Sequence, residues 1–377
     1  MTTLARPDSV SVRVPAKINL ELLVGRRRAD GYHDLSTVFH AVSLFDEVTA
    51  TPADDWSVSL AGPQTQRVPA DGDNLALRAA RLLARRAREA QSGHGADRIG
   101  PVHLHIDKEI PVAGGMAGGS ADAAAALIAC DALWGSAVGR EELDACAAQL
   151  GSDVNFALTG GTAIGSGRGE QVTPVLAQGR YHWVLVPSED GLSTGEVFAE
   201  HDRLRAQAAQ REDAAQEATH HAAQVPGAGG ADPVGGPALG RGPGGLRLVP
   251  DPDGAAAAER LGRRARGSGA LHPGPDMMQA LRGGDVTALA GALHNDLQAA
   301  ALSLRPELGD VLAAGIEYGA LGGVVSGSGP TVAFLVSGPE GALDLAVALM
   351  ASGTASHVVR ATGPAHGAHI VAEPRTR

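Results

Sequence analysis

A glycine-rich stretch at residues 111–122 has the composition of a phosphate-binding loop. It reads P-V-A-G-G-M-A-G-G-S-A-D, with four glycines within six residues and then Ser120. Glycine lets the backbone approach a ligand without interference from a Cβ atom. The free N–H groups at the start of a following helix, together with the helix dipole, favour an anion. Because the chain holds 51 glycines, composition alone also fits a flexible surface loop.

The residues around this loop strengthen the phosphate interpretation. Val102, Leu104 and Ile106 alternate with polar residues and predict a strand before the loop. An alanine-rich run at residues 121–134, ending at Gly135, predicts a helix after it, with Ser120 at its entrance. The loop is not a Walker A motif, since no Lys-Ser or Lys-Thr follows its last glycine, and it is not G-x-G-x-x-G.

Three other polar residues have types that phosphoryl transfer could use. Lys17 and Asn19 are two residues apart on a predicted strand, so they lie side by side on one face. By spacing alone, they fit a solvated strand face. Asp153 follows Gly-Ser at the expected start of a helical turn, where it fits a capping aspartate. Spacing therefore leaves a structural and a catalytic role open for all three.

The loop resembles the P-x-x-x-G-[LM]-[AG]-[GS]-[GS]-S-A motif of the GHMP small-molecule kinases, in which it wraps the phosphates of ATP. G-S-D-V-N-F at residues 151–156, H-N-D-L-Q at residues 294–298 and V-V-S-G-S-G-P-T at residues 324–331 are similar to further segments of that family. P-A-K-I-N-L and R-A-D-G-Y-H, near the N-terminus, resemble one branch. That branch phosphorylates the 2-hydroxyl of 4-(cytidine 5′-diphospho)-2-C-methyl-D-erythritol in the non-mevalonate route to isopentenyl diphosphate.

The resemblance implies a role for each candidate residue. Lys17 and Asp153 would be catalytic: Asp153 would accept the hydroxyl proton, and Lys17 would keep it ionised and stabilise charge on the γ-phosphate. ATP would be held by Pro111, Val112, Ala113, Gly114, Gly115, Met116, Ala117, Gly118, Gly119, Ser120 and Ala121. The cytidine-bearing substrate would contact Asn19, Tyr32, His33, Thr194 and Phe198. ATP with Mg²⁺ is the expected cofactor. The metal ligands are unknown, although Ser120 would lie near the ion.

Two other functions stay open at this point. One is a GHMP kinase for a different substrate, such as homoserine or mevalonate. The block containing Tyr32 and His33 argues against it, because those kinases have no cytosine to hold. The other is a nucleotide-binding regulator without catalysis, and the presence of both Lys17 and Asp153 argues against that. Asn155 and Gly195 stand where the family often has proline.

The remaining elements follow from apolar periodicity. Strands are expected at residues 10–14 and 18–22, with a break at Pro15, and at residues 42–50, 181–187, 332–336 and 357–360. Helices are expected after Asn74 and at residues 141–150, 193–204, 276–297, 308–316 and 342–350, with a frayed tail from Gly363. Residues 206–272, crowded with Gly and Pro in the middle, predict a disordered insertion in which residues 208–223 are transiently helical.

The resemblance also implies the architecture. It predicts an α+β chain with the two-domain GHMP kinase fold. The N-terminal domain, at residues 1–165, would be ribosomal protein S5 domain 2-like. The C-terminal domain, at residues 166–377, would be ferredoxin-like and interrupted by the insertion at residues 206–272.

Composition limits the partners. A net charge of −11 argues against a general nucleic-acid binder, which would normally be basic. Two cysteines, Cys130 and Cys146, on apolar helix faces argue against a disulfide framework and fit a reducing, cytoplasmic setting. No apolar run approaches ~18 residues, so no membrane partner is expected. A small-molecule substrate carrying a cytidine diphosphate remains, in a monomer or a homodimer.

Overall fold

The computed structural model describes residues 7–90, 96–188, 190–224 and 271–371. It forms two compact units: Met1–His201 with Leu271–Arg377, and Asp202–Ala270. The helix α5 (Thr194–Gln224) begins in the first unit and continues into the second. All candidate site residues belong to the first unit.

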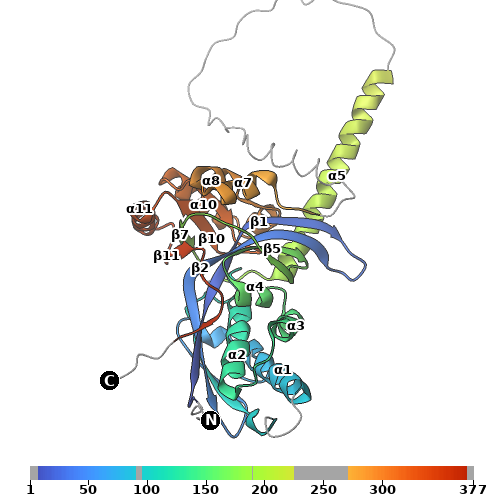
Figure 1. Ribbon diagram of the computed structural model, residues 1–377. Helices are drawn as coiled ribbons and strands as arrows, with labels where there is room; N and C mark the ends of the chain where they lie inside the picture. Colours follow the sequence, from blue (N-terminus) through green and yellow to red (C-terminus); the bar gives the residue numbers. More distant parts are fainter. Residues whose placement is uncertain (1–6, 91–95, 189, 225–270, 372–377) are drawn as a thin grey trace, which may run out of the picture. The chain divides into compact units, whose positions relative to one another are not determined.

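An eight-stranded sheet in the first unit is built around a long antiparallel hairpin (Figure 1). The hairpin pairs β1 (Val10–Arg27) with β2 (His33–Pro52). β2 also pairs with β4 (Val102–Asp107), which pairs in parallel with β3 (Ser57–Ala61). Another part of β2 pairs with β5 (Thr162–Gly167), which in turn pairs with β6 (Gln171–Pro174). The short strands β8 (His294–Asn295) and β12 (His369–Ile370) pair with β1. The hairpin therefore collects segments from both ends of the chain.

Helices α1 (Leu75–Ala90), α2 (Gly118–Trp134), α3 (Arg140–Leu150) and α4 (Val154–Thr159) lie on one face of this sheet (Figure 1). α2 is central, because it contacts β1, β2 and the other three helices. Its alanines at residues 123–126 are fully buried. Small side chains let this helix pack closely against the sheet, so that the core is filled although only 3% of the residues are aromatic.

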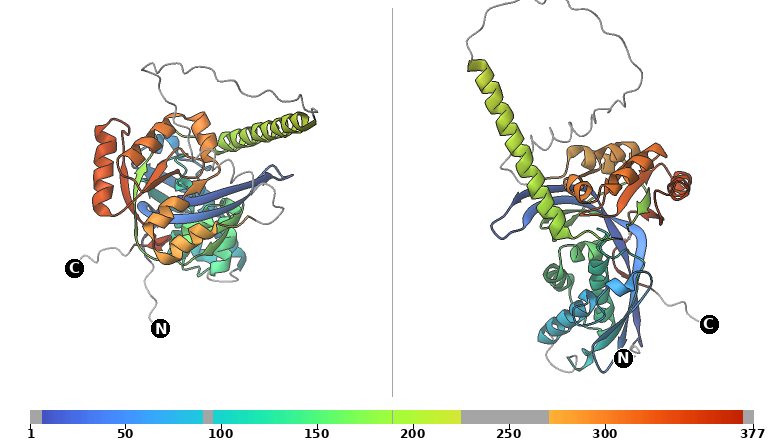
Figure 2. Two further views of the ribbon diagram at one scale, coloured as in Figure 1. Left: turned by 90° about the horizontal axis from the view of Figure 1, so that it is seen from above. Right: turned by 180° about the vertical axis from the view of Figure 1, so that it is seen from behind.

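A second, four-stranded antiparallel sheet has the order β11 (Val359–Gly363), β7 (Tyr181–Val186), β10 (Val332–Val336), β9 (Gly322–Val325). Around it lie α7 (Pro275–Gly283), α8 (Val286–Ala292), α9 (Gln298–Leu304), α10 (Glu307–Glu317) and α11 (Pro339–Ala351) (Figure 2). α10 approaches β10 so closely that a Cβ atom on Gly315 would lie 2.2 Å from the ring of Phe334. Two short 3-10 helices, η1 (Thr65–Arg67) and η2 (Ala96–Arg98), complete the described elements.

The predicted α+β class is confirmed, as are the helices at residues 141–150 and 308–316 and the capping role of Asn74. Asn74 Oδ1 accepts hydrogen bonds from the backbone N–H groups of Ala76 and Leu77. Cys130 and Cys146 are both free and buried, as expected. No helix among the described residues has an apolar stretch long enough to cross a membrane. The domain boundary at residues 165 and 166 stays a prediction.

The predicted ends of β1, α2 and α5 were wrong. β1 does not end at Pro15, because the pairing with β2 shifts register between Pro15 and Ala16, and a β-bulge tolerates a residue without an N–H. α2 begins at Gly118, three residues earlier than predicted, so Ser120 lies within its first turn. α5 runs to Gln224, so the first part of the predicted insertion is a helix. The rest of that prediction, residues 225–270, lies outside the described residues.

The C-terminal part differs in two further ways. The helix predicted at residues 276–297 is two helices, α7 and α8, separated at Gly284, whose positive φ of 66° ends α7, and followed by the strand β8. The tail from Gly363 is not frayed over residues 363–371. Ala365 N–H donates to Ala41 O, Val371 N–H donates to Ser11 O, and β12 pairs with β1. Backbone hydrogen bonds to an existing sheet edge hold a segment whose own sequence has little strand pattern.

Candidate active site

Lys17 lies buried on β1 with its ammonium group only partly paired. Lys17 is 7% exposed, and its Nζ donates to Asn19 Oδ1 at 2.7 Å. Asn19 Nδ2 in turn donates to Thr37 Oγ1 at 2.8 Å, which fixes the amide orientation. Asp153 Oδ2 lies 4.0 Å from Lys17 Nζ, beyond hydrogen-bond distance. Burial lowers the pKa of Lys17, and the charge on Asp153 opposes this only in part.

Asp153 stands at the start of α4 but does not cap it. It occupies the N-cap position, yet its side chain accepts no hydrogen bond from the helix N–H groups. Asp285 provides the contrast, since its carboxylate accepts from both Thr287 N–H and Ala288 N–H at the start of α8. The Asp153 side chain is 30% exposed. The capping explanation therefore fails, and the carboxylate is free to act on a bound molecule beside Lys17.

The glycine loop has the backbone conformation expected of a ligand cradle. Ala113 and Ala117 adopt left-handed conformations, with φ of 55° and 60°. This conformation costs a non-glycine residue about 1–2 kcal/mol, so surrounding contacts must hold it. The N-terminus of α2 has no side-chain cap, and its first turn begins directly after Ala117. Unpaired N–H groups at the end of a 17-residue helix are suited to an anionic phosphate.

The second glycine loop, residues 326–330, lies against the first one and against Lys17. Ser326 Oγ donates to Gly115 O at 3.1 Å, and Thr331 N–H donates to Gly114 O at 3.3 Å. A Cβ atom on Gly327 would lie 3.2 Å from both Lys17 Nζ and Asn19 Oδ1. Gly327 also has a positive φ of 59°, so two independent reasons require glycine there.

Asn295, on β8, fixes this second loop. Its Nδ2 donates to both Val325 O and Gly327 O at 2.7 Å. The H-N-D-L-Q segment, which the sequence marked only by its resemblance to the family, thus holds the second glycine loop through Asn295. Lys17 N–H donates to Met116 O at 3.3 Å, which ties the first loop to β1. Four segments far apart in the chain therefore meet around the Lys17 ammonium group.

The residues predicted to hold the cytidine form a second group. The His33 ring stacks on the Phe198 ring, with centroids 5.1 Å apart and planes at 25°. His33 is buried, whereas Tyr32 is 55% exposed. Thr194 Oγ1 lies 3.0 Å from Ser328 Oγ, which joins this group to the second glycine loop. A stacked pair of rings with an exposed tyrosine beside it suits a planar heterocycle.

Arg168, which the sequence did not single out, covers Tyr32. Its guanidinium lies 4.9 Å from the centroid of the Tyr32 ring. The turn between β5 and β6 holds Arg168 there, because Glu170 accepts from Arg168 N–H at 2.6 Å. No signal near Arg168 in the sequence predicts this contact, since it depends on the pairing of β5 with β2.

The described residues contain no group of three or more His, Cys, Asp or Glu side chains that could hold a metal ion by themselves. In a nucleotide site, Mg²⁺ keeps several waters and binds phosphates together with only one or two protein oxygens. Ser120, in the first turn of α2, lies beside Gly151, because a Cβ atom on Gly151 would be 3.8 Å from Ser120 Oγ. Ser120 Oγ is therefore the side-chain oxygen that would lie near the ion.

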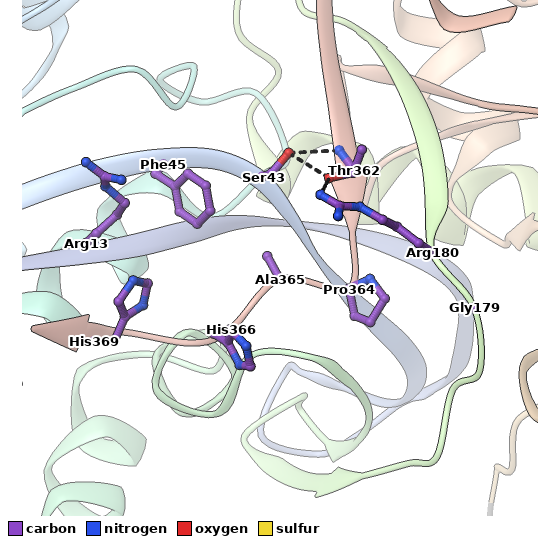
Figure 3. Close-up of a pocket in the computed structure, with 10 residues that line it drawn as sticks. All are labelled: Arg13, Ser43, Phe45, Gly179, Arg180, Thr362, Pro364, Ala365, His366 and His369. Carbon is purple, nitrogen blue, oxygen red and sulfur yellow. Dashed lines mark hydrogen bonds between the residues drawn. The ribbon is translucent and has the colours of Figure 1, made fainter. Parts of the chain in front are cut away.

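A separate hollow of about 560 Å³ lies between the hairpin and the C-terminal segment (Figure 3). It is lined by Arg13, Ser43, Phe45, Gly179, Arg180, Thr362, Pro364, Ala365, His366 and His369, none of which is a candidate site residue. Its main polar groups are already paired: Arg13 with Glu47, and Arg180 and Ser43 with Thr362. Lys17 and Asp153 are therefore better candidates for catalytic residues than the side chains that line this hollow.

Comparison with known proteins agrees with the motifs. The sequence profile "GHMP kinases N terminal domain" matches residues 74–163, and "GHMP kinases C terminal" matches residues 277–353. The 4-diphosphocytidyl-2-C-methyl-D-erythritol kinase of Leifsonia xyli subsp. xyli is 46% identical over 97% of this chain and 100% of its own length. The enzyme of the same name from Thermobifida fusca is 47% identical, over 97% and 99%.

Solved structures give the same result for the fold. A crystal structure of 4-(cytidine 5′-diphospho)-2C-methyl-D-erythritol kinase aligns with a TM-score of 0.60 and 29% identity, covering 93% of this chain and 98% of that one. Homoserine kinase from Cytophaga hutchinsonii aligns with a TM-score of 0.62 at 15% identity, which supports the fold alone. The chain belongs to the GHMP kinase family and has its two-domain α+β fold, within the group of the 4-diphosphocytidyl-2-C-methyl-D-erythritol kinases.

Proposed function

We propose that this chain is an ATP-dependent kinase that phosphorylates the 2-hydroxyl of 4-(cytidine 5′-diphospho)-2-C-methyl-D-erythritol. The names of relatives at 46–47% identity over nearly the whole chain support the substrate. The observation that carries the chemistry is the uncapped Asp153 carboxylate, 4.0 Å from a buried lysine that is itself beside the glycine loop. The reaction belongs to the non-mevalonate route to isopentenyl diphosphate.

The proposed mechanism uses few groups. The 2-hydroxyl oxygen attacks the γ-phosphorus of ATP, the bond from that phosphorus to the bridging oxygen breaks, and ADP leaves. Asp153 accepts the hydroxyl proton. Lys17 donates to a γ-phosphate oxygen, and its ammonium group gains the anionic partner that the described residues do not supply within hydrogen-bond distance. Phosphoryl transfer depends mainly on such positioning and charge stabilisation.

The two glycine loops would bind the nucleotide. The first loop, residues 111–121, would surround the phosphates with backbone N–H groups at the start of α2. The second loop, closed against the first by Ser326 and Thr331, would limit the space beside Lys17. Mg²⁺ supplies charge neutralisation on the phosphates when it is bound. Asn19 holds Lys17 in place through their 2.7 Å hydrogen bond.

The cytosine would bind at the aromatic group. His33, stacked on Phe198, presents an edge with donor and acceptor capacity, and the exposed Tyr32 ring offers a surface for stacking. Thr194 would lie at the edge of the same site. The two unpaired cysteines fit a reducing cytosol, which is where we place this enzyme. A monomer or a homodimer would both suit this mechanism.

The test is turnover of ATP with three acceptors offered separately: the cytidylated methylerythritol, homoserine and mevalonate. We expect ADP release with the first acceptor only, with the new phosphate on its 2-hydroxyl by ³¹P NMR. Turnover with homoserine or mevalonate instead would assign another GHMP kinase activity. ATP binding by calorimetry without turnover of any acceptor would indicate a regulator.

A further inference from the structure

A buried cluster of three charged residues encloses the ends of the glycine loop. Lys108, three residues before the loop, is 2% exposed, and Asp122, directly after the loop, is 3% exposed. Lys108 Nζ donates to Asp122 Oδ2 at 2.9 Å and also to Asp46 Oδ2 on β2. Asp46 Oδ1 accepts from Glu109 N–H at 2.7 Å and from Ile110 N–H at 2.8 Å. One cluster thus joins both ends of the loop to the central hairpin.

Stability alone does not explain three charges in this core. Moving each ion out of water costs several kcal/mol, and apolar replacements of buried ion pairs are often neutral or stabilising. The neighbours are apolar or small: a Cβ atom on Gly118 would lie 3.0 Å from Lys108 Nζ and 3.2 Å from a methyl group of Ile110. What the cluster offers instead of stability is directional bonding, because an ammonium group holds two carboxylates at fixed distances.

The two carboxylates of the cluster differ in their other partners. One ammonium group faces two carboxylates, and Asp46 receives two additional backbone hydrogen bonds. Burial, which Lys108 opposes and Asp46 reinforces, raises the pKa of Asp122 well above its usual range. Asp122 Oδ1 has no hydrogen-bond partner within the described part of the chain. Asp122→Asn keeps the shape of this side chain and an oxygen that can accept the hydrogen bond from Lys108 Nζ.

The loop needs such an anchor. It contains four glycines and two alanines in the left-handed conformation, so by itself it would populate many other conformations. Its middle is held by single hydrogen bonds to Lys17, Ser326 and Thr331. The ends of the loop are held by the cluster, which also fixes the start of α2, where the N–H groups would meet the phosphates in the proposed function.

We propose that Lys108, Asp46 and Asp122 form a positioning clamp for the nucleotide loop, so that they set the affinity for ATP without touching it. This inference rests on the proposed kinase function, in which residues 111–121 bind the phosphates. The clamp acts on the nucleotide only. It should leave recognition of the cytidylated acceptor at His33 and Tyr32 unchanged.

The experiment compares variants at the two ends of α2. Asp122→Ala removes the clamp at the start of the helix. Asp131→Ala is the matched control, because Asp131 Oδ1 accepts from Ser136 Oγ at 2.6 Å and Val138 N–H at 2.9 Å at the opposite end. Each variant is assayed for ATP binding by calorimetry with Mg²⁺ present, for KM of the acceptor, and for melting temperature. Calorimetry needs no turnover, so a failed clamp is distinguishable from a failed kinase assignment.

We expect Asp122→Ala to weaken ATP binding at least tenfold with the KM of the acceptor within twofold of wild type. Asp122→Asn should restore ATP binding to within about threefold. Asp131→Ala should lower the melting temperature and leave ATP binding unchanged. If Asp122→Ala is unfolded, Asp122→Ser takes its place, since its hydroxyl is one atom too short to reach Lys108. Equal losses of ATP affinity in Asp122→Ala and Asp131→Ala, or unchanged ATP affinity in a folded Asp122→Ala or Asp122→Ser variant, would overturn the proposal.

Discussion

Lys17 and Lys108, the two lysines of the chain, occupy regions that are alike in burial and opposite in charge compensation. Lys108 donates to two carboxylates and has no unmet need for a counter-ion. Lys17 has a neutral amide at 2.7 Å and a carboxylate only at 4.0 Å. Both lie beside the same glycine loop. This difference indicates that Lys108 stabilises the structure of the loop, whereas Lys17 is able to bind a negatively charged ligand.

The pKa directions agree with this difference. Burial lowers the pKa of Lys17, and Asp153 compensates only in part. At Lys108, burial acts in the same direction, but the carboxylates of Asp122 and Asp46 outweigh it, so that the pKa is raised. A lysine that must stabilise charge in a transition state gains more from a phosphate when the protein has left it poorly compensated.

The largest effect is expected at Asp153. Asp153→Asn removes the basic oxygen and keeps the shape, so kcat should fall by roughly 10²–10⁴ while ATP still binds. The lower end is favoured because a loose transition state involves little early proton loss. Since the Asp153 side chain makes no cap hydrogen bond, the free energy of unfolding should not change. The measurements are steady-state kinetics and chemical denaturation.

Asp285→Ala is the matched control for that experiment, because Asp285 does cap its helix. It should destabilise the protein by about 1 kcal/mol and leave kcat unchanged. A folded Asp153→Asn enzyme with kcat within a few-fold of wild type would eliminate Asp153 as the base. Catalysis would then rest on Lys17 and the metal ion.

The next largest effect concerns the stability of the protein. Lys108→Met leaves two buried carboxylates without their cation, and breaking a buried ion pair in this way costs about 3–5 kcal/mol. Lys17→Met should not destabilise the protein, because it removes a poorly compensated buried charge, but it should abolish turnover. Chemical denaturation of the two variants measures the contrast. Equal destabilisation by both substitutions would contradict the distinction between the two lysines.

A smaller effect is expected at His33, which belongs to neither lysine cluster. His33→Ala should raise the KM for the cytidylated acceptor roughly 5–150-fold, the equivalent of ~1–3 kcal/mol for a buried polar contact. The Kd for ATP should stay within twofold of wild type. Phe198→Leu, which removes the ring stacked on His33, should show a weaker effect in the same direction. Parallel losses for both substrates would show that His33 only supports the fold.

The comparison also explains what the sequence could predict. Lys17, Asp153 and the two glycine loops lie in motifs whose order along the chain matches a known family, and the structure brings them together. Asp46, Lys108 and Asp122 form no pattern, because their proximity depends on β2, β4 and α2 meeting in space. Asp46 lies within β2, Lys108 directly follows β4, and Asp122 lies near the start of α2, so each looks like an ordinary charged residue. Arg168 was missed for the same reason, since only strand pairing places it over Tyr32.

The predicted ends of helices and strands were wrong where tertiary contacts override local sequence preference. Pro15 predicts a strand end, but a bulge in the hairpin accommodates it. Residues 369–370 lack a strand pattern, yet they pair with β1 because an unpaired sheet edge is available. The extent of α5 beyond Leu204 is a different case. An alanine- and glutamine-rich run has high helix propensity, so the helix continues where the sequence analysis expected only transient helicity.

The smallest effect is a difference between two titration curves, and the composition of the chain makes it directly measurable. Because the chain holds two lysines, labelling with ¹³C-lysine gives two side-chain signals, which Lys17→Arg assigns. The Lys17 signal should titrate below 10.5, the ordinary lysine pKa, and the Lys108 signal should titrate above it. The stability contributions of Lys17 and Lys108 therefore change with pH in opposite directions. Lys108 stabilises the fold below 10.5, and this contribution is lost as the pH rises through its folded pKa.

Lys17 has the opposite linkage, because the unfolded chain binds its proton more tightly than the folded protein does. Its contribution to stability therefore rises with pH from its folded pKa up to 10.5. Asp153→Asn removes the charge that raises this pKa, so the Lys17 signal should move to a still lower pH, and ATP binding should move it to a higher one. Neither change should shift the Lys108 curve. A Lys17 curve that is unaffected by both Asp153→Asn and ATP would mean that this lysine faces neither the carboxylate nor the phosphates, and the catalytic pair would have to be abandoned.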